Sequence, residues 1–299
     1  MNFVKKIIIK IINKTSLSLY NSSVPIKYKI KLAKSIKIPD DKYLNSSVKS
    51  DKKVAIHFHV FYVDLLEEIY SHLENIRISF TLFITVVTED DLAYAEKFFT
   101  DHNHNFEVKI KKVENRGRDI YPFYQALHDC YKDYDIIAHF HTKKSLHTDF
   151  GNIWRKYLYH NLLGSKYFFE NLVSYLDKKE KIGFATTPII PLKNVIQAYF
   201  GYAENRVEYK ANIEFALNAF GVPTEMLYNR KKNMDFPCGN MFVAKTNAIR
   251  QFFEAELDKN SFPDEEGQLT GTLQHYVELM WKYIVLYNGY EYCEVLNKE

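Results

Sequence analysis

The chain has 299 residues, of which 46% are hydrophobic and 26% are charged, and its formal net charge is +3. This composition is typical of a globular protein with a sizeable core, in one large domain or two small ones. Its three cysteines, Cys130, Cys238 and Cys293, are too few and too scattered for a disulfide framework or a zinc cluster, which favours a reducing, cytosolic compartment.

Residues 1–53 are predicted to form a basic amphipathic arm followed by a linker. Residues 1–50 hold eleven lysines but only two acids, so the remaining residues are acidic on balance. One face of a helix here would carry Phe3, Val4, Ile7, Ile8, Ile11 and Ile12. Such a helix is too short to span a bilayer and is typical of a segment that lies on an anionic membrane surface. The alternative is a helix packed on the domain or on a partner.

The globular part is predicted to begin near Val54 with alternating strands and helices. The expected strands are Val54–Val60, Ser79–Val87, Glu107–Val113 and Asp135–His141, and the helices between them are Asp64–Glu74, Asp90–Thr100 and Ile120–Tyr131. This alternation predicts an α/β fold with a Rossmann-like, mostly parallel sheet flanked by helices.

The second half of the chain is less regular. We expect helices at Asn152–Leu163, Lys166–Leu176, Ala211–Phe220, Asn247–Leu257 and Thr270–Leu286, with strands at Ile182–Thr187 and Met241–Ala244. Residues 188–209 have the pattern of a loop region.

A glycine-containing turn joins the third expected strand to the helix after it. The turn reads Asn115, Arg116, Gly117, Arg118 and Asp119. Glycine lets the backbone approach a bound group closely, and the planar arginine side chains suit phosphate or carboxylate. Asp119 is placed to cap the next helix, or to hold a sugar hydroxyl or a metal. The alternative is a basic surface turn with a helix cap.

The order of this turn and four later motifs resembles the rhamnan synthesis protein F family of bacterial glycosyltransferases. The later motifs are His141–Ser145, Phe236–Phe242, Phe262–Gln268 and Gly271–His275. The resemblance runs from about Val54 to about Tyr290. It implies a single GT-A-like transferase domain over 54–299, with a nucleotide-sugar half at about 54–150 and an acceptor half at about 151–299.

The resemblance places the donor beside the turn at 115–119 and the end of the fourth strand. Many GT-A enzymes carry an Asp-x-Asp pair for a divalent metal after that strand, whereas this chain has His141, Thr142 and Lys143 there. Lys143 and Lys144 would neutralise a diphosphate directly. We therefore expect a site that depends less on metal, and leave Mg²⁺ or Mn²⁺ open as a cofactor.

Four histidines are predicted to converge. On their strands His57 and His59 share one face, and so do His139 and His141. If the sheet order is 3-2-1-4, the first and fourth strands are neighbours, and the imidazoles meet near the carboxyl edge where such sheets bind ligands. One interpretation is a metal cluster, although no acid has matching spacing. In the other, His59 and His141 contact the phosphate or sugar of the donor, while His57 and His139 are packed deeper and hydrogen bonded.

Further candidates have two interpretations each. Thr88, after the second strand, would contact the nucleotide or cap the next helix. Trp154 would stack on a sugar ring or anchor the core. Gly239 and Asn240 would line the acceptor side, as would His275, or the first two would form a turn before a strand.

A general base for the acceptor hydroxyl is sought among the acids. Asp264 and Glu265, together with Asp119, are the candidates, and the alternative for the first two is an exposed acidic loop. The family pattern has an Asp at the position of Thr270 and an Arg at that of Leu279, and these departures leave the base unassigned.

The resemblance therefore implies a glycosyltransferase that moves a sugar from a nucleotide sugar to a cell-surface polysaccharide or a lipid-linked glycan. The family name implies dTDP-rhamnose as donor, and the residues do not distinguish it from a UDP or GDP sugar. The expected location is the inner face of the cytoplasmic membrane. The alternative is a non-catalytic, membrane-associated module for polysaccharide assembly with a degenerate transferase fold. Nucleic acid is not an expected partner, because the basic charge lies in the arm.

Overall fold

The computed structural model describes residues 34–42, 51–142, 144, 150–189, 206–227, 237, 239–266 and 272–298. The predicted amphipathic helix and Lys143 lie outside these ranges, as does most of the loop expected at 188–209. Within the described part, eight strands form one sheet in the order β1-β8-β6-β7-β5-β2-β3-β4.

The sheet confirms the predicted α/β class. Its strands are β1 (Ile36–Pro39), β2 (Val54–His59), β3 (Phe80–Val86), β4 (Glu107–Lys112), β5 (Ile136–His141), β6 (Ile182–Thr186), β7 (Phe242–Lys245) and β8 (Glu291–Lys298). The four strands of the first half have the order β4-β3-β2-β5, which is the predicted order 3-2-1-4. Strand β7 runs antiparallel to its neighbours β5 and β6, and the other pairs are parallel.

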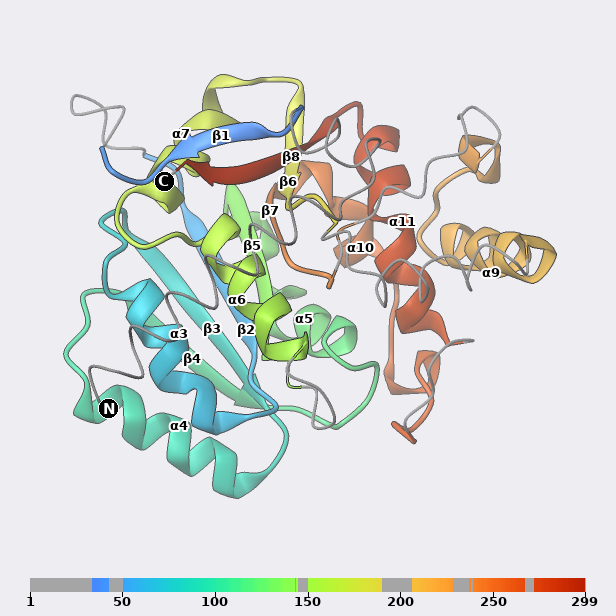
Figure 1. Cartoon of the computed structure of the whole chain (residues 1–299). Helices are drawn as coiled ribbons and strands as arrows, with labels where there is room; N and C mark the ends of the chain where they lie inside the picture. The colour runs from blue at the N-terminus through green and yellow to red at the C-terminus, as the bar shows by residue number, and fades with distance from the viewer. Residues whose placement is uncertain are drawn as a thin grey trace.

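Helices cover both faces of the sheet (Figure 1). They are α3 (Leu66–Leu73), α4 (Glu89–Asp101), α5 (Ile120–Leu127), α6 (Phe150–Leu162), α7 (Phe168–Lys178), α9 (Arg206–Ala219), α10 (Arg250–Glu254) and α11 (Leu273–Tyr287). Short 3₁₀ turns lie at Val63–Leu65, Tyr131–Asp133, Thr224–Leu227, Thr246–Ala248 and Lys259–Ser261. The core of one face is shared with α3, α4, α6 and α7, and that of the other with α5, α9, α10 and α11.

The alternation of side chains along β2 explains this division. Val54, Ile56 and Phe58 belong to the core under α3 and α6, whereas Ala55 belongs to the core under α5 and α11. His57 and His59 share the side of Ala55. The histidine-bearing face of the sheet is therefore the face that α5 and α11 cover.

Part of the expected linker is a structural element of the domain. Within residues 15–53, Ile36–Pro39 forms β1 and pairs in parallel with β8. Asp40 follows it and is buried, and its carboxylate accepts hydrogen bonds from the backbone N–H groups of Ser165, Lys166, Tyr167 and Phe168 at 2.7–3.0 Å. The domain therefore begins upstream of Val54, because Asp40 satisfies the N–H groups at the start of α7.

Other departures fall in the second half. The helix expected at Asn247–Leu257 is only a 3₁₀ turn followed by the short α10. Strand β8 was not anticipated from the sequence, and it joins β1 to β6.

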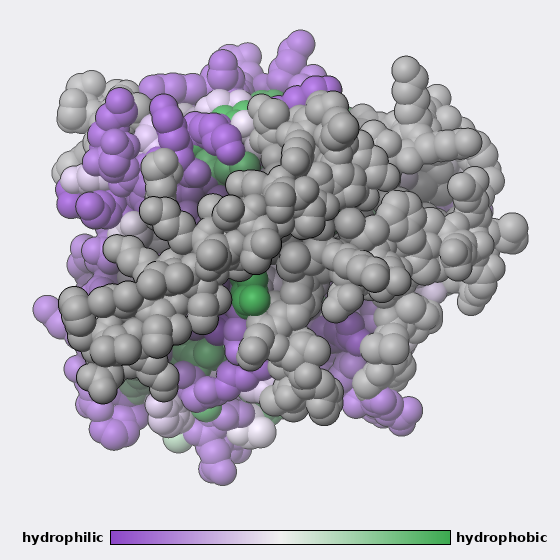
Figure 2. Space-filling model, viewed as in Figure 1, coloured by the Kyte–Doolittle hydropathy of each residue, from purple (hydrophilic) through white to green (hydrophobic). Residues whose placement is uncertain are grey.

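The described part of the surface in Figure 2 carries no extended apolar face. There the described surface is mainly hydrophilic, with small and separate hydrophobic patches. Among the described residues, no helix combines the length and the apolar character needed to cross a bilayer.

Candidate active site

A cavity of about 390 Å³ lies at the carboxyl ends of β2 and β5. Twelve residues line it: His59, Phe61, Tyr62, Asn115, Arg118, Asp119, His141, Thr142, Lys144, Gly239, Glu265 and Glu278. The carboxyl edge is where open α/β sheets bind ligands. Eight of these residues were candidates from the sequence, and the fold brings them together from five separate segments.

The turn at 115–119 enters the cavity through an unusual backbone. Gly117 has φ +65° and Arg118 has φ +53°, so two consecutive residues adopt the left-handed conformation. Such a conformation is rare for a non-glycine residue and is found at ligand sites. A Cβ on Gly117 would lie 2.8 Å from side-chain atoms of both Phe262 and Tyr121, so the position requires glycine for space as well as for conformation.

A distant segment, residues 262–266, holds this turn in place. The guanidinium of Arg116 donates to the carbonyl oxygen of Phe262 at 2.9 Å and forms an ion pair with Asp264. Arg118 Nε lies 3.4 Å from Glu265 Oε1. Asp264 is exposed and does not line the cavity, whereas Glu265 is mostly buried and does. The turn is therefore held by contacts with a distant segment and is not an isolated surface turn.

Asp119 is buried and stands at the N-cap position of α5, but its side chain makes no capping hydrogen bond, so the capping interpretation is wrong. Its Oδ2 accepts hydrogen bonds from Asn240 Nδ2 at 2.5 Å and from His139 Nε2 at 3.0 Å. Trp281 Nε1 in turn donates to Asn240 Oδ1 at 2.7 Å. Burial acts to raise the pKa of Asp119, but the nearby His141 and the hydrogen bonds from His139 and Asn240 outweigh it and lower the pKa below its ordinary value.

The predicted convergence of histidines is confirmed. In the register of β2 and β5, His57 pairs with His139 and His59 with His141. His57 and His139 are fully buried, and their Nδ1 atoms lie 3.0 Å apart. Thr85 Oγ1 lies 3.1 Å from His57 Nε2 and 3.0 Å from His59 Nδ1. Phe123 of α5 stacks on His139 with the ring centroids 4.3 Å apart.

Burial keeps three of these imidazoles neutral. It lowers the pKa of His57 well below the ordinary value and also lowers the pKa of His139, although Asp119 opposes the shift in His139. It lowers the pKa of His59 to about 3. The deeper pair is thus packed and hydrogen bonded, as predicted, and His59 links it to the cavity.

The wall beyond β5 carries His141 and Lys144. His141 Nε2 donates to the carbonyl oxygen of Gly239 at 2.7 Å. Lys144 forms an ion pair with Asp64 and lies over the ring of Tyr62, 5.0 Å from its centroid. Among the described residues, no three His, Cys, Asp or Glu side chains are arranged to hold a metal ion. The metal-cluster interpretation of the histidines therefore finds no ligand set in this part of the chain.

The remaining candidates lie around the cavity or apart from it. Thr88 caps α4, because its hydroxyl accepts a hydrogen bond from Asp91 N at 3.1 Å, and it does not line the cavity. Trp154 packs against the core and flanks Gly239, whose φ is +79°. His275 is buried on α11 and is hydrogen bonded to Thr272, away from the cavity wall.

Four residues of the wall were not candidates from the sequence: Phe61, Tyr62, Thr142 and Glu278. The sequence could have indicated Glu278, because it is one of only two charged residues in the 15-residue helix α11. Leu279, where the family pattern has Arg, is buried in the core beside it, and Thr270 lies outside the described residues.

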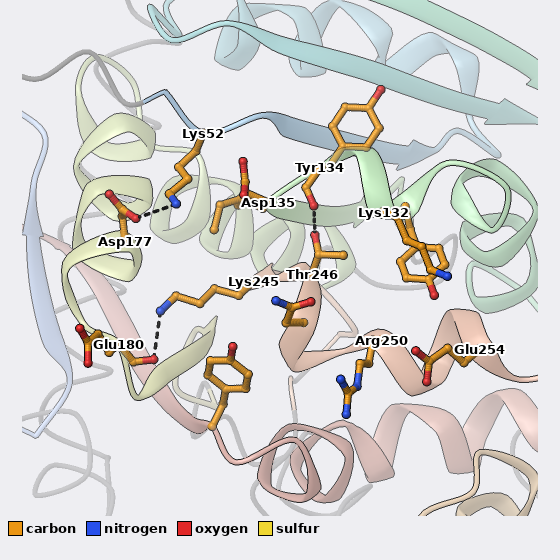
Figure 3. A pocket seen from close by; sticks show the side chains of 14 residues that line it. Lys52, Lys132, Tyr134, Asp135, Asp177, Glu180, Lys245, Thr246, Arg250 and Glu254 are labelled. Atoms are coloured by element: carbon orange, nitrogen blue, oxygen red, sulfur yellow. Dashed lines mark hydrogen bonds and ion pairs between the residues drawn. The ribbon is translucent and has the colours of Figure 1, made fainter.

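A larger hollow, of about 610 Å³, lies near the amino ends of β2 and β5 (Figure 3). Two of its lysines have partners within the protein: Lys52 Nζ lies 3.3 Å from Asp177, and Lys245 Nζ donates to the carbonyl oxygens of Lys179 and Glu180. None of the candidate residues lines it. We therefore place the candidate site at the carboxyl edge.

Comparison with known proteins agrees with the motifs. The sequence model of the family described as "Rhamnan synthesis protein F" matches residues 13–290. Two curated relatives called "Uncharacterized protein WxcX", from two strains of Xanthomonas campestris pv. campestris, are each 28% identical over 238 residues. The match covers 79% of this chain but 32% of each relative, so this chain spans about a third of their length.

A solved structure of core-mannan synthase A from Aspergillus fumigatus, in its Mn/GDP form, matches 82% of this chain and 74% of its own. The identity is 9% and the TM-score is 0.30, so the similarity is too weak to support a functional comparison.

Proposed function

This chain belongs to the rhamnan synthesis protein F family, and we propose that it is a glycosyltransferase that moves a sugar from a nucleotide sugar to a cell-surface polysaccharide or a lipid-linked glycan. The observation that carries the proposal is the composition of the carboxyl-edge cavity. Cations, carboxylates and aromatic rings from separate segments meet around one space. A diphosphate, sugar hydroxyls and a flat ring are the groups that such a wall can bind.

The donor lies along the turn at 115–119. Arg118 and Lys144 face the same cavity and would bind the diphosphate, whose charge grows as the sugar leaves. Phe61 is 45% exposed at the cavity and, with Tyr62, would stack on the base or on a sugar. The family name favours dTDP-rhamnose, and a UDP or GDP sugar is the alternative.

We expect side chains of the protein to stabilise the leaving group, with Mg²⁺ or Mn²⁺ left open as a cofactor. Acid side chains do line the cavity, but they are not grouped as metal ligands. Two of them are already engaged, because Glu265 faces Arg118 and Asp119 accepts hydrogen bonds from His139 and Asn240.

Glu265 is the general base. Its Oε2 is buried and has no hydrogen-bond partner among the described residues, although its Oε1 faces Arg118. A buried carboxylate oxygen without a partner is positioned to receive a ligand hydroxyl. In the reaction the acceptor oxygen bonds to the anomeric carbon, the bond from that carbon to the diphosphate breaks, and the hydroxyl proton passes to Glu265. Asp264 supports the turn through Arg116 instead.

The test is Glu265→Gln, with Glu266→Gln as a matched control on the exposed side of the same segment. We expect Glu265→Gln to lower the rate of sugar transfer by about 10²–10⁴-fold, with nucleotide-sugar binding changed little. The assay would screen dTDP-rhamnose, UDP-glucose and GDP-mannose for hydrolysis and transfer. Full activity of Glu265→Gln would remove its assignment as base.

The same screen separates catalysis from the alternative, a non-catalytic assembly module. The absence of an Asp-x-Asp pair after β5 favours that alternative. A wild-type protein that binds a nucleotide sugar but never cleaves it would support the module. We further propose that the basic arm predicted within residues 1–53 attaches the enzyme to the anionic inner face of the cytoplasmic membrane, since each lysine near such a surface contributes on the order of 1 kcal/mol.

A further inference from the structure

We propose that a buried chain of hydrogen bonds from Asp119 fixes the tautomer of His59, so that its Nε2 faces the cavity without a proton and accepts a hydrogen bond from a hydroxyl group of the bound nucleotide sugar. The proposal rests on the proposed function for the identity of the ligand. The tautomer itself follows from contacts inside the protein.

The chain of hydrogen bonds begins at Trp281, whose indole N–H can only donate. The indole Nε1–H of Trp281 donates to Asn240 Oδ1, which fixes the orientation of that amide. Asn240 Nδ2 must then donate to Asp119 Oδ2. Asp119 therefore acts as an ionised acceptor, which agrees with its lowered pKa.

The ring nitrogen that carries each further proton follows from the hydrogen bond before it. His139 Nε2–H donates to Asp119, so the Nδ1 of the neutral His139 carries a lone pair. The partner of that lone pair is the Nδ1–H of His57, and the Nε2 of the neutral His57 is then an acceptor.

The last two links reach the cavity. The single hydroxyl proton of Thr85 goes to His57 Nε2, so Thr85 Oγ1 is left to accept from His59 Nδ1–H. A neutral His59 protonated at Nδ1 has its lone pair on Nε2. The opposite polarity would require a protonated Asp119, which its hydrogen bond from Asn240 opposes.

The polarity decides what His59 can bind. A lone pair accepts a hydrogen bond from a sugar or ribose hydroxyl and repels the oxygens of a diphosphate. Of the two ligand groups expected for His59, the structure thus favours the hydroxyl. The phosphate remains with Arg118 and Lys144, which line the same cavity.

The tautomer can be read directly. The full-length protein, labelled with ¹⁵N on its histidine rings, would be studied by two-bond ¹H–¹⁵N correlation spectra near pH 7.5, with His59→Gln used to assign the His59 signals. We expect wild-type His59 to be protonated at Nδ1 and bare at Nε2. Thr85→Val should shift His59 toward the Nε2–H form, and Thr85→Ser should retain the wild-type pattern. A wild-type His59 with its proton on Nε2 would overturn the proposal.

Binding tests the consequence. UDP-glucose, dTDP-rhamnose, UDP, dTDP and pyrophosphate would be titrated into wild type, Thr85→Val and Thr85→Ser. We expect Thr85→Val to weaken nucleotide-sugar binding by roughly 3- to 10-fold, the value of one hydrogen bond, with pyrophosphate binding unchanged. An equal loss for UDP and dTDP would place the hydroxyl on the ribose, and a loss confined to nucleotide sugars would place it on the sugar.

Two outcomes have separate meanings. An equal loss for pyrophosphate would show a phosphate contact and overturn the proposal. Failure of the wild type to bind any nucleotide sugar would count against the proposed function, while the spectrum would still decide the tautomer.

Discussion

At the scale of single residues, Arg118 and Lys144 are the Lys and Arg side chains that the described structure places on the cavity wall. Both face an acid, Arg118 with Glu265 and Lys144 with Asp64. These pairs hold the cations near the cavity, and a bound diphosphate would compete for them as a more strongly charged partner. The acids thus position the cations beside the cavity.

We expect Lys144→Ala to lower kcat/KM for the nucleotide sugar by about 10- to 100-fold, because a charge-assisted hydrogen bond contributes roughly 1.5–3 kcal/mol. Lys156→Ala, on the exposed face of α6, is the control. EDTA should reduce activity only partly, because the described cavity residues do not form a metal-ligating group. Complete loss with EDTA that Mn²⁺ restores would instead favour a metal-dependent reaction.

The residues of this site differ in how far the sequence could predict them. His57, His59, His139 and His141 were placed correctly, because strand periodicity and the strand order fix their face and their neighbours. The contact of Arg116 with Phe262 was not predictable, because it joins segments 146 residues apart. The same holds for Asn240, whose amide donates to Asp119, and for Trp281, whose indole donates to Asn240. These contacts form only once β7 has paired with β5 and α11 covers the same face of the sheet.

At the scale of elements, β1 shows why the first boundary was placed too late. The strand has only four residues, includes Lys37 and Pro39, and finds its partner at the far end of the chain in β8. Local pattern cannot reveal such a pairing. The long, strongly patterned elements of the first half were predicted within a few residues, since their signal lies within each segment.

We predict that Asp40→Ala destabilises the protein by at least about 3 kcal/mol, because several backbone N–H groups at the start of α7 lose a charged acceptor. Asp41→Ala, at the exposed neighbouring residue, should change stability little. A protein that begins at Asp51 should be destabilised for the same reason, since it lacks β1 and Asp40. Chemical denaturation would measure both effects, and unchanged unfolding midpoints would show that β1 is dispensable.

At the scale of the whole molecule, the buried polar network lies where β2, β3 and β5 meet α5 and α11, so its charge state affects the folding of the entire domain. His57, His59 and His139 have pKa values below the ordinary value of about 6.5, because burial disfavours the charged ring. An unfolded chain would bind protons at these histidines as the pH falls through that value, and the folded chain would not. The free energy of unfolding is therefore highest above about pH 6.5, where the histidines are neutral in both states, and it decreases as the pH falls below that value.

We predict that the free energy of unfolding falls as the pH is lowered from 6.5 toward 4.5, by on the order of 1.4 kcal/mol per pH unit for each of these histidines that stays unprotonated in the folded chain. Below about pH 4, Asp40 and Asp119 add to the loss. Their pKa values are lowered in the folded protein, so these carboxylates take up protons at a higher pH in the unfolded chain than in the folded one. Urea denaturation at half-unit steps of pH would measure the slope. His57→Gln should reduce this slope by about the contribution of one histidine. A wild-type unfolding midpoint that stays constant between pH 7.5 and 5 would show that the three buried histidines titrate normally and are not held neutral by the fold.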